Sequence, residues 1–96
     1  MIRTIIIDDE PNNVDTLRQL LLKYCPTITV IGTADNAQTG REAIVTLKPD
    51  LVFLDIEMPY GNAFELLNNL SVIDFEIVFV TRPPTSDHQL LGDAKN

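Results

Sequence analysis

The sequence predicts an α/β fold, a doubly wound parallel sheet with helices on both faces. Short β-branched apolar runs alternate with segments in which apolar residues recur every three or four positions. The resulting order β-α-β-α-β-α-β, at this spacing, favours right-handed crossovers between parallel strands. The length of 96 residues with 45% hydrophobic and 22% charged residues indicates one globular domain.

Four apolar runs are predicted as strands. Residues 2–7 are almost wholly β-branched and apolar, which is typical of a strand buried on both faces inside a parallel sheet. Residues 28–33 are less uniformly apolar, so this strand is expected nearer an edge. Residues 51–54 form a third buried strand that closes in Asp55, and residues 77–80 form a fourth that is followed by Thr81.

Three helices are predicted at about residues 12–24, 36–47 and 62–70. Asn36 is the expected N-cap of the second helix, and Pro26 and Pro49 end the first two. The positions expected to face the sheet are spaced by three or four residues. They are Val14, Leu17, Leu20, Leu21 and Tyr24 in the first helix, Ala37, Gly40, Ala43, Ile44 and Leu47 in the second, and Phe64, Leu66, Leu67 and Leu70 in the third.

Residues 82–96 do not continue this alternation. They open with two prolines after Arg82 and are mostly polar, so we expect an irregular or flexible tail after a domain at residues 1–81.

The composition also excludes several classes of protein. The formal net charge is -7, and such an acidic chain repels phosphate backbones and anionic lipid, so neither nucleic acid nor membrane is an expected partner of this chain itself. The single cysteine cannot form an internal disulfide and fits a reducing compartment. No apolar run approaches the roughly 20 residues of a membrane span, and no secretory signal opens the chain. We therefore expect a cytoplasmic protein.

Acidic side chains follow two of the predicted strands. Asp8, Asp9 and Glu10 come after the first strand and Asp55 after the third, while Thr81 follows the fourth. Ligands of open α/β sheets bind outside the carboxyl ends of the strands, so these groups meet at one edge if the first and third strands are neighbours.

Such a cluster has a chemical and a purely structural interpretation. Oxygen-only ligands suit Mg²⁺, and a carboxylate beside that ion can attack phosphorus to form an acyl phosphate. Acidic residues before a helix are also common simply as caps. The joint placement of Asp8, Asp9, Asp55 and Thr81 at strand ends favours a site.

Three segments in order resemble the response-regulator receiver domain of two-component signalling. They are Asp8-Asp9-Glu10-Pro11 after a strand, Phe53-Leu54-Asp55-Ile56-Glu57-Met58-Pro59, and Val78-Phe79-Val80-Thr81. The resemblance covers residues 1–81 and implies the flavodoxin-like receiver fold with strand order 2-1-3-4. The motif after the third strand also resembles receivers that precede a LytTR-type DNA-binding domain.

The resemblance implies a role for each matching residue. Asp55 is the implied phosphoacceptor, and Asp8 and Asp9 form the acidic Mg²⁺ pocket, with Asp9 as a direct ligand. The backbone carbonyl of Glu57 is a further ligand, and the hydroxyl of Thr81 contacts the phosphoryl group. The implied partner is a sensor histidine kinase, and the reaction is a self-modification, not turnover by an enzyme.

The sequence also departs from the family. Ala63 replaces a usual glycine, Arg82 replaces a usual small residue, and the family pattern continues for about one more strand and two helices. No Lys-Pro pair follows Thr81, so Lys95 is not assigned the family's lysine role. We therefore expect an incomplete receiver fold in which the strand at residues 77–80 has an open edge.

An open apolar edge invites pairing with another chain, which predicts a homodimer through the side of residues 77–80. Two other functions are considered beside the phosphoacceptor. One is a non-phosphorylated interaction or dimerisation module on the receiver scaffold. The other is a Mg²⁺-dependent phosphohydrolase, which the doubled Asp8-Asp9 disfavours.

Overall fold

The structure is a computed structural model that describes residues 1–56, 63–68, 70–71 and 73–80. These residues form alternating strands and helices in the predicted order. The strands are β1 (Ile2–Ile7), β2 (Ile28–Ala34), β3 (Leu51–Asp55) and β4 (Glu76–Val80). The helices are α1 (Pro11–Tyr24), α2 (Ala37–Leu47) and α3 (Ala63–Asn68).

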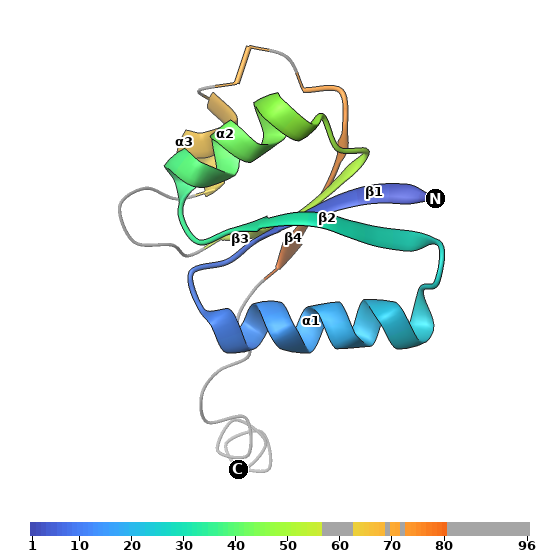
Figure 1. Cartoon of the computed structure of the whole chain (residues 1–96). Helices are drawn as coiled ribbons and strands as arrows, with labels where there is room; N and C mark the ends of the chain where they lie inside the picture. The colour runs from blue at the N-terminus through green and yellow to red at the C-terminus, as the bar shows by residue number, and fades with distance from the viewer. Residues whose placement is uncertain (57–62, 69, 72, 81–96) are drawn as a thin grey trace, which may run out of the picture.

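The strands form one parallel sheet in the order β2-β1-β3-β4 (Figure 1). Strand β1 lies inside the sheet between β2 and β3, and its residues from Thr4 to Ile7 are buried. Strand β2 lies at one edge of the described sheet, as its weaker apolar pattern predicted. The fold class and the strand order 2-1-3-4 are therefore confirmed.

Helices cover both faces of the sheet. Helix α1 packs on one face, whereas α2 and α3 pack together on the other (Figure 1). The main core lies under α2 and α3, because the side chains of β1 and β3 that point to this face are buried against both helices. Its members are Ile5, Ile7, Ile44, Val52, Leu54, Ala63 and Leu66.

The ends of α1 and α2 follow from local sequence. The side chain of Glu10 caps α1 by accepting from the backbone N–H of Asn12 at 3.3 Å, and Pro11 occupies the first turn, where its missing N–H costs nothing. Asn36 caps α2 as predicted, with its side chain accepting from the N–H of Thr39 at 2.9 Å. Helix α2 ends at Leu47, and its C-cap Lys48 has a left-handed φ of 49° directly before Pro49.

Three residues predicted to face the sheet are instead exposed. Leu20 and Tyr24 of α1 are 48% and 66% exposed, because the side of α1 that packs on the sheet is centred on Leu21. Phe64 is 57% exposed because Ala63 and Leu66 are the residues of α3 that turn inward. The ring of Phe64 contacts the ring of Phe79 in β4, with centroids 5.8 Å apart.

Among the described residues, no helix combines the length and apolar character that crossing a membrane requires.

Candidate acidic site at the carboxyl edge of the sheet

Strands β1 and β3 bring their acidic residues to the same edge of the sheet. The two strands are adjacent and parallel, and Ile7 lies opposite Leu54 in their register. Asp8 directly follows Ile7 and Asp55 directly follows Leu54, so the two carboxylate residues come one position after a paired position of β1 and β3. The condition stated from sequence, that the first and third strands are neighbours, is met.

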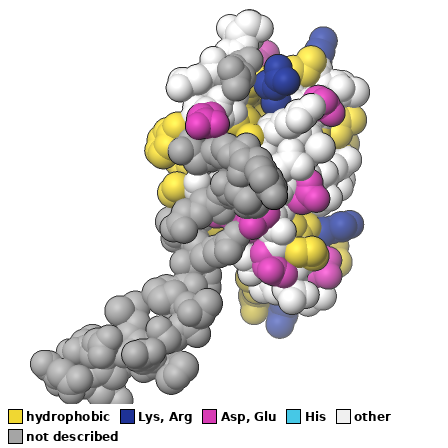
Figure 2. Space-filling view, turned by 90° about the vertical axis from the view of Figure 1, so that its left-hand side faces the viewer, with side chains coloured by type: hydrophobic (Ala, Val, Ile, Leu, Met, Phe, Trp, Pro, Cys, Tyr) yellow, Lys and Arg dark blue, Asp and Glu magenta, His cyan; other side chains and the backbone are white. Residues whose placement is uncertain are grey.

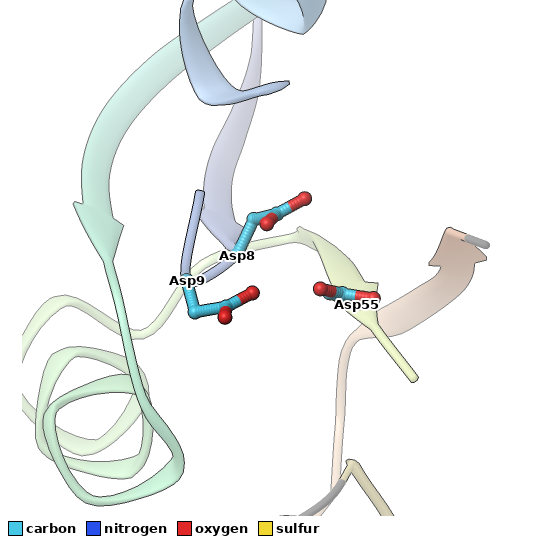
Figure 3. Close-up of side chains that lie close together, drawn as sticks. All are labelled: Asp8, Asp9 and Asp55. Atoms are coloured by element: carbon cyan, nitrogen blue, oxygen red, sulfur yellow. The ribbon is translucent and has the colours of Figure 1, made fainter. Parts of the chain in front are cut away.

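The carboxylates of Asp8, Asp9 and Asp55 form a close cluster. One oxygen from each of the three lies within 4.8 Å of the other two. Figure 3 shows the side chains of Asp8 and Asp9, from the end of β1, around the same space as that of Asp55, from the end of β3. Asp8 is 5% exposed and Asp55 only 1%, whereas Asp9 is half-buried.

Backbone contacts fix the position of Asp8. Its N–H donates to the carbonyl of Ala34 at 2.9 Å, which ties the end of β1 to β2. One oxygen of its carboxylate accepts from the N–H of Glu10 at 2.9 Å, which turns the chain toward α1. The side chain of Glu10 caps α1, so the purely structural interpretation of acidic residues before a helix holds for Glu10.

The cluster has the chemistry of a site for a hard divalent cation. Three carboxylates at this separation repel one another, and the repulsion is strong where burial excludes water. A cation bound among the oxygens relieves it, and oxygen-only donors of this kind suit Mg²⁺ better than metals that prefer nitrogen or sulfur. The residues present therefore fit Mg²⁺.

Two predicted site residues, Glu57 and Thr81, lie outside the described residues. Their backbone neighbours do reach the same edge, because Val80 pairs with Asp55 and its carbonyl accepts from the N–H of Ile56 at 3.2 Å.

A hollow of about 480 Å³ adjoins Asp8 and was not singled out from sequence. It is lined by Asp8, Pro11, Val14, Asp15, Arg18, Thr33, Ala34, Asp35 and Thr39. The sequence could have indicated this hollow, because residues 33–35 end or follow the predicted second strand and so reach the same edge of a parallel sheet.

An open parallel sheet with a carboxylate cluster at its carboxyl edge defines an α/β protein of the doubly wound class with an acidic site. Residues 4–92 match the family model of the response regulator receiver domain. The chain belongs to the response regulator receiver domain family.

Relatives of known sequence agree with this family. An uncharacterized response regulatory protein of Vibrio cholerae serotype O1 is 45% identical over 82 residues, which is 84% of this chain and 34% of that protein. The nitrate/nitrite response regulator protein NarL of Escherichia coli K12 is 41% identical over 66 residues, which is 69% of this chain and 30% of NarL. The chain thus spans about a third of the length of these two relatives.

The fold is also that of a solved receiver domain. The response regulator domain of Thermotoga maritima CheB superposes with a TM-score of 0.77 over 99% of this chain and 72% of that chain. At 24% identity this likeness concerns the fold alone.

Proposed function

We propose that the chain is the phosphoacceptor module of a two-component response regulator, which takes a phosphoryl group from a sensor histidine kinase onto Asp55. The observation that carries the proposal is the cluster of Asp8, Asp9 and Asp55 at the carboxyl edge of the sheet. Membership of the receiver family supports it, since the resemblance of the segment after β3 to the family's motif implies that Asp55 is the phosphoacceptor. We place this reaction in the cytoplasm.

The proposed reaction is a single group transfer. A carboxylate oxygen of Asp55 attacks phosphorus, the bond from phosphorus to the imidazole nitrogen of the kinase phosphohistidine breaks, and its electron pair stays on that nitrogen. The product is an acyl phosphate on Asp55. Because Asp55 is consumed in each event, the chain is modified and does not turn over a free substrate.

We propose that Asp8 and Asp9 bind Mg²⁺, with Asp9 as a direct ligand. Asp55 and the backbone carbonyl of Glu57 are the other proposed protein ligands. When bound, Mg²⁺ supplies positive charge that neutralises the carboxylates and the incoming phosphoryl oxygens. Asp9 is half-buried and is the most exposed of the three side chains. We propose that the side-chain hydroxyl of Thr81 contacts the phosphoryl group.

The test is phosphorylation by the small donor acetyl phosphate with Mg²⁺, followed by intact mass spectrometry. We expect one phosphoryl adduct that hydroxylamine removes, since hydroxylamine cleaves acyl phosphates and not phosphate esters. Asp55→Asn is expected to abolish the adduct because the amide is a poor nucleophile. A chelator is expected to reduce it strongly.

Asp74→Asn is the matched control, because Asp74 is exposed and precedes β4, at the end of the strand opposite the site. It is expected to keep the adduct. A wild-type chain that acquires no adduct would overturn the proposal and leave a non-phosphorylated interaction module on the same scaffold. An adduct that survives in Asp55→Asn would assign the phosphoacceptor elsewhere.

A second copy of the chain is a further proposed partner, through the side of β4. In the described part of the sheet β4 has β3 as its neighbour on one side, and Val78 and Phe79 are 41% and 42% exposed.

A further inference from the structure

The short connection between β1 and α1 joins the acidic cluster to the start of a helix (Figure 1). It consists of Asp8, Asp9 and Glu10, and α1 begins at Pro11. Its first residue is fixed to the sheet, because the N–H of Asp8 donates to the carbonyl of Ala34 in β2 at 2.9 Å. Only Glu10 therefore separates the two cluster residues of this segment from the first residue of α1.

Glu10 makes hydrogen bonds to both sides of this connection. Toward the cluster, its N–H donates to Oδ1 of Asp8 at 2.9 Å. Toward the helix, its carbonyl accepts from the N–H groups of Asn13 and Val14 at 3.0 and 3.2 Å, and its side chain accepts from the N–H of Asn12 at 3.3 Å. The same residue therefore orients a carboxylate of the cluster and caps the helix.

The hydrogen bond from Glu10 restricts the carboxylate of Asp8. When one oxygen of a carboxylate is held by a backbone donor, the direction of its other oxygen is set as well. Asp8 is only 5% exposed, which leaves little water to replace that donor. The position of Glu10 thus determines how the carboxylate of Asp8 faces those of Asp9 and Asp55 in the cluster.

We propose that Glu10 is a positioning residue for the cation of the acidic cluster and couples occupation of the cluster to the order of the first turn of α1. The side-chain cap fixes the backbone of residue 10 against the helix, and the N–H of that residue fixes Asp8. Such an oriented ligand raises metal affinity, because less order has to be gained during binding. The inference rests on the Mg²⁺ site proposed above and does not depend on phosphorylation.

The coupling acts in both directions, as thermodynamic linkage requires. Loss of the cap lets residue 10 and the carboxylate of Asp8 move, which lowers the affinity for the cation. Conversely, a cation that holds Asp8 also holds the N–H of Glu10 and keeps the first turn of α1 closed. That turn is sensitive to such a contact, because the first N–H groups of a helix lack partners in a preceding turn and helix ends fray.

A purely electrostatic role of Glu10 would give a different result. Its carboxylate adds negative charge near the cluster, which attracts a cation whether or not the side chain caps the helix. Glutamine removes this charge but keeps a side-chain oxygen that accepts from the N–H of Asn12, whereas alanine removes both. Glu10→Gln and Glu10→Ala therefore distinguish capping from charge.

The first test is titration of the full 96-residue chain with MgCl₂ at constant ionic strength, followed by backbone amide shifts in nuclear magnetic resonance. We expect Glu10→Ala to raise the Kd about 3–10-fold, less than the roughly 10–100-fold effect of removing a residue that hydrogen-bonds a metal ligand directly. Glu10→Gln is expected to keep the wild-type Kd.

Asn36→Ala is the matched control, because it removes the equivalent cap from α2. The hydrogen bonds of Asn36 go to Asp35, Thr39 and Gly40, which are not members of the cluster. This variant is expected to lose stability and to keep the wild-type Kd. Circular dichroism checks that every variant is folded.

Hydrogen exchange of the wild-type chain gives the second test. MgCl₂ is expected to slow the exchange of the N–H groups of Glu10, Asn13 and Val14, which exchange through local opening of the first turn of α1. The N–H groups of Thr39 and Gly40, in the first turn of α2, are expected to keep their rates. In Glu10→Ala the protection of α1 by MgCl₂ should be lost.

The outcomes distinguish this coupling from the site on which it depends. A wild-type chain whose amide shifts do not respond to MgCl₂ overturns the Mg²⁺ site and the coupling with it. An unchanged Kd in folded Glu10→Ala overturns the coupling alone. An equal rise in Kd in Glu10→Gln assigns the effect to charge, and an equal rise in Asn36→Ala assigns it to lost stability, so either result overturns the positioning role. Equal protection of α1 and α2 by MgCl₂ does the same.

Discussion

Gly40 of α2 is packed against side chains of β1 and α3. A Cβ atom at this position would lie 2.8 Å from Cδ1 of Ile7 and 3.0 Å from Cδ1 of Leu66, both of which are fully packed core residues. We predict that Gly40→Ala lowers the free energy of unfolding by about 1–3 kcal/mol, the usual cost of overpacking a core. This loss exceeds the gain of up to about 1 kcal/mol that alanine brings to a helix interior. Urea denaturation measures the difference.

Thr46→Ala is the control for helix propensity, because Thr46 is exposed on the same helix. It is expected to leave stability unchanged or slightly raised. A Gly40→Ala variant as stable as Thr46→Ala would show that Ile7 and Leu66 move aside at little cost.

At the residue scale, the sequence predicted the acidic cluster better than the exposure of single apolar residues. Asp8, Asp9 and Asp55 could be placed because a strand end fixes where the next side chain lies. Tyr24 and Phe64 were predicted wrongly to face the sheet. A helical repeat defines an apolar stripe but not how wide a part of it the neighbouring elements cover. The roles assigned to Glu57 and Thr81 remain predictions.

The carboxyl end of α2 is held by a side chain from β1. The guanidinium of Arg3 donates to the carbonyls of Leu47 and Lys48, each at 2.7 Å, at the point where Lys48 adopts its left-handed conformation. We predict that Arg3→Met lowers the free energy of unfolding by about 1–2 kcal/mol, because two charge-assisted hydrogen bonds to the helix end are lost. Chemical denaturation with circular dichroism measures this.

Arg41→Met is the matched control, since Arg41 is exposed in the middle of α2, away from the helix end. It removes the same charge and is expected to change stability by less than about 0.5 kcal/mol. Equal losses in both variants would mean that net charge, and not the contact with the helix end, explains the effect of Arg3.

At the element scale, caps and prolines located the helices within a residue or two where they were present. Asn36 and Pro49 bracket α2, and the sequence placed both ends correctly. Helix α3 was predicted at about residues 62–70 and is described at Ala63–Asn68, while residues 62 and 69 lie outside the described part of the chain. The contact of Arg3 with α2 could not be predicted, because it joins residues 44 and 45 positions apart.

At the scale of the whole molecule, the alternation of strands and helices predicted the layers but did not by itself fix the order of the strands. That order came from the resemblance to the receiver family, and it is what brings Asp8 beside Asp55. Any order that separated β1 from β3 would have left two distant acidic strand ends. The site is therefore a property of the sheet topology, and its charge is expected to affect the stability of the entire fold.

The last prediction concerns this link between the site and global stability. A cation that binds only the folded chain stabilises it by about 2.7 kcal/mol at a concentration 100 times its Kd. For a domain of this size that corresponds to a rise of roughly 10–20 °C in Tm, since each kcal/mol shifts Tm by about 4–8 °C. We expect saturating MgCl₂ to raise the Tm of the wild-type chain, measured by differential scanning calorimetry against KCl of equal ionic strength.

Variants of the cluster distinguish binding of Mg²⁺ at a specific site from general screening of the negative charge of the chain. Asp9→Asn and Asp55→Asn each remove one charge of the cluster, so without Mg²⁺ they are expected to be at least as stable as the wild type, because repulsion among the three carboxylates falls. When Mg²⁺ is added, their Tm is expected to rise much less than that of the wild type, because one ligand or its charge is missing. Asp74→Asn, which removes an exposed charge elsewhere, should keep the full rise. An equal rise in all four chains would show that Mg²⁺ acts on the net charge of -7 and not on the cluster.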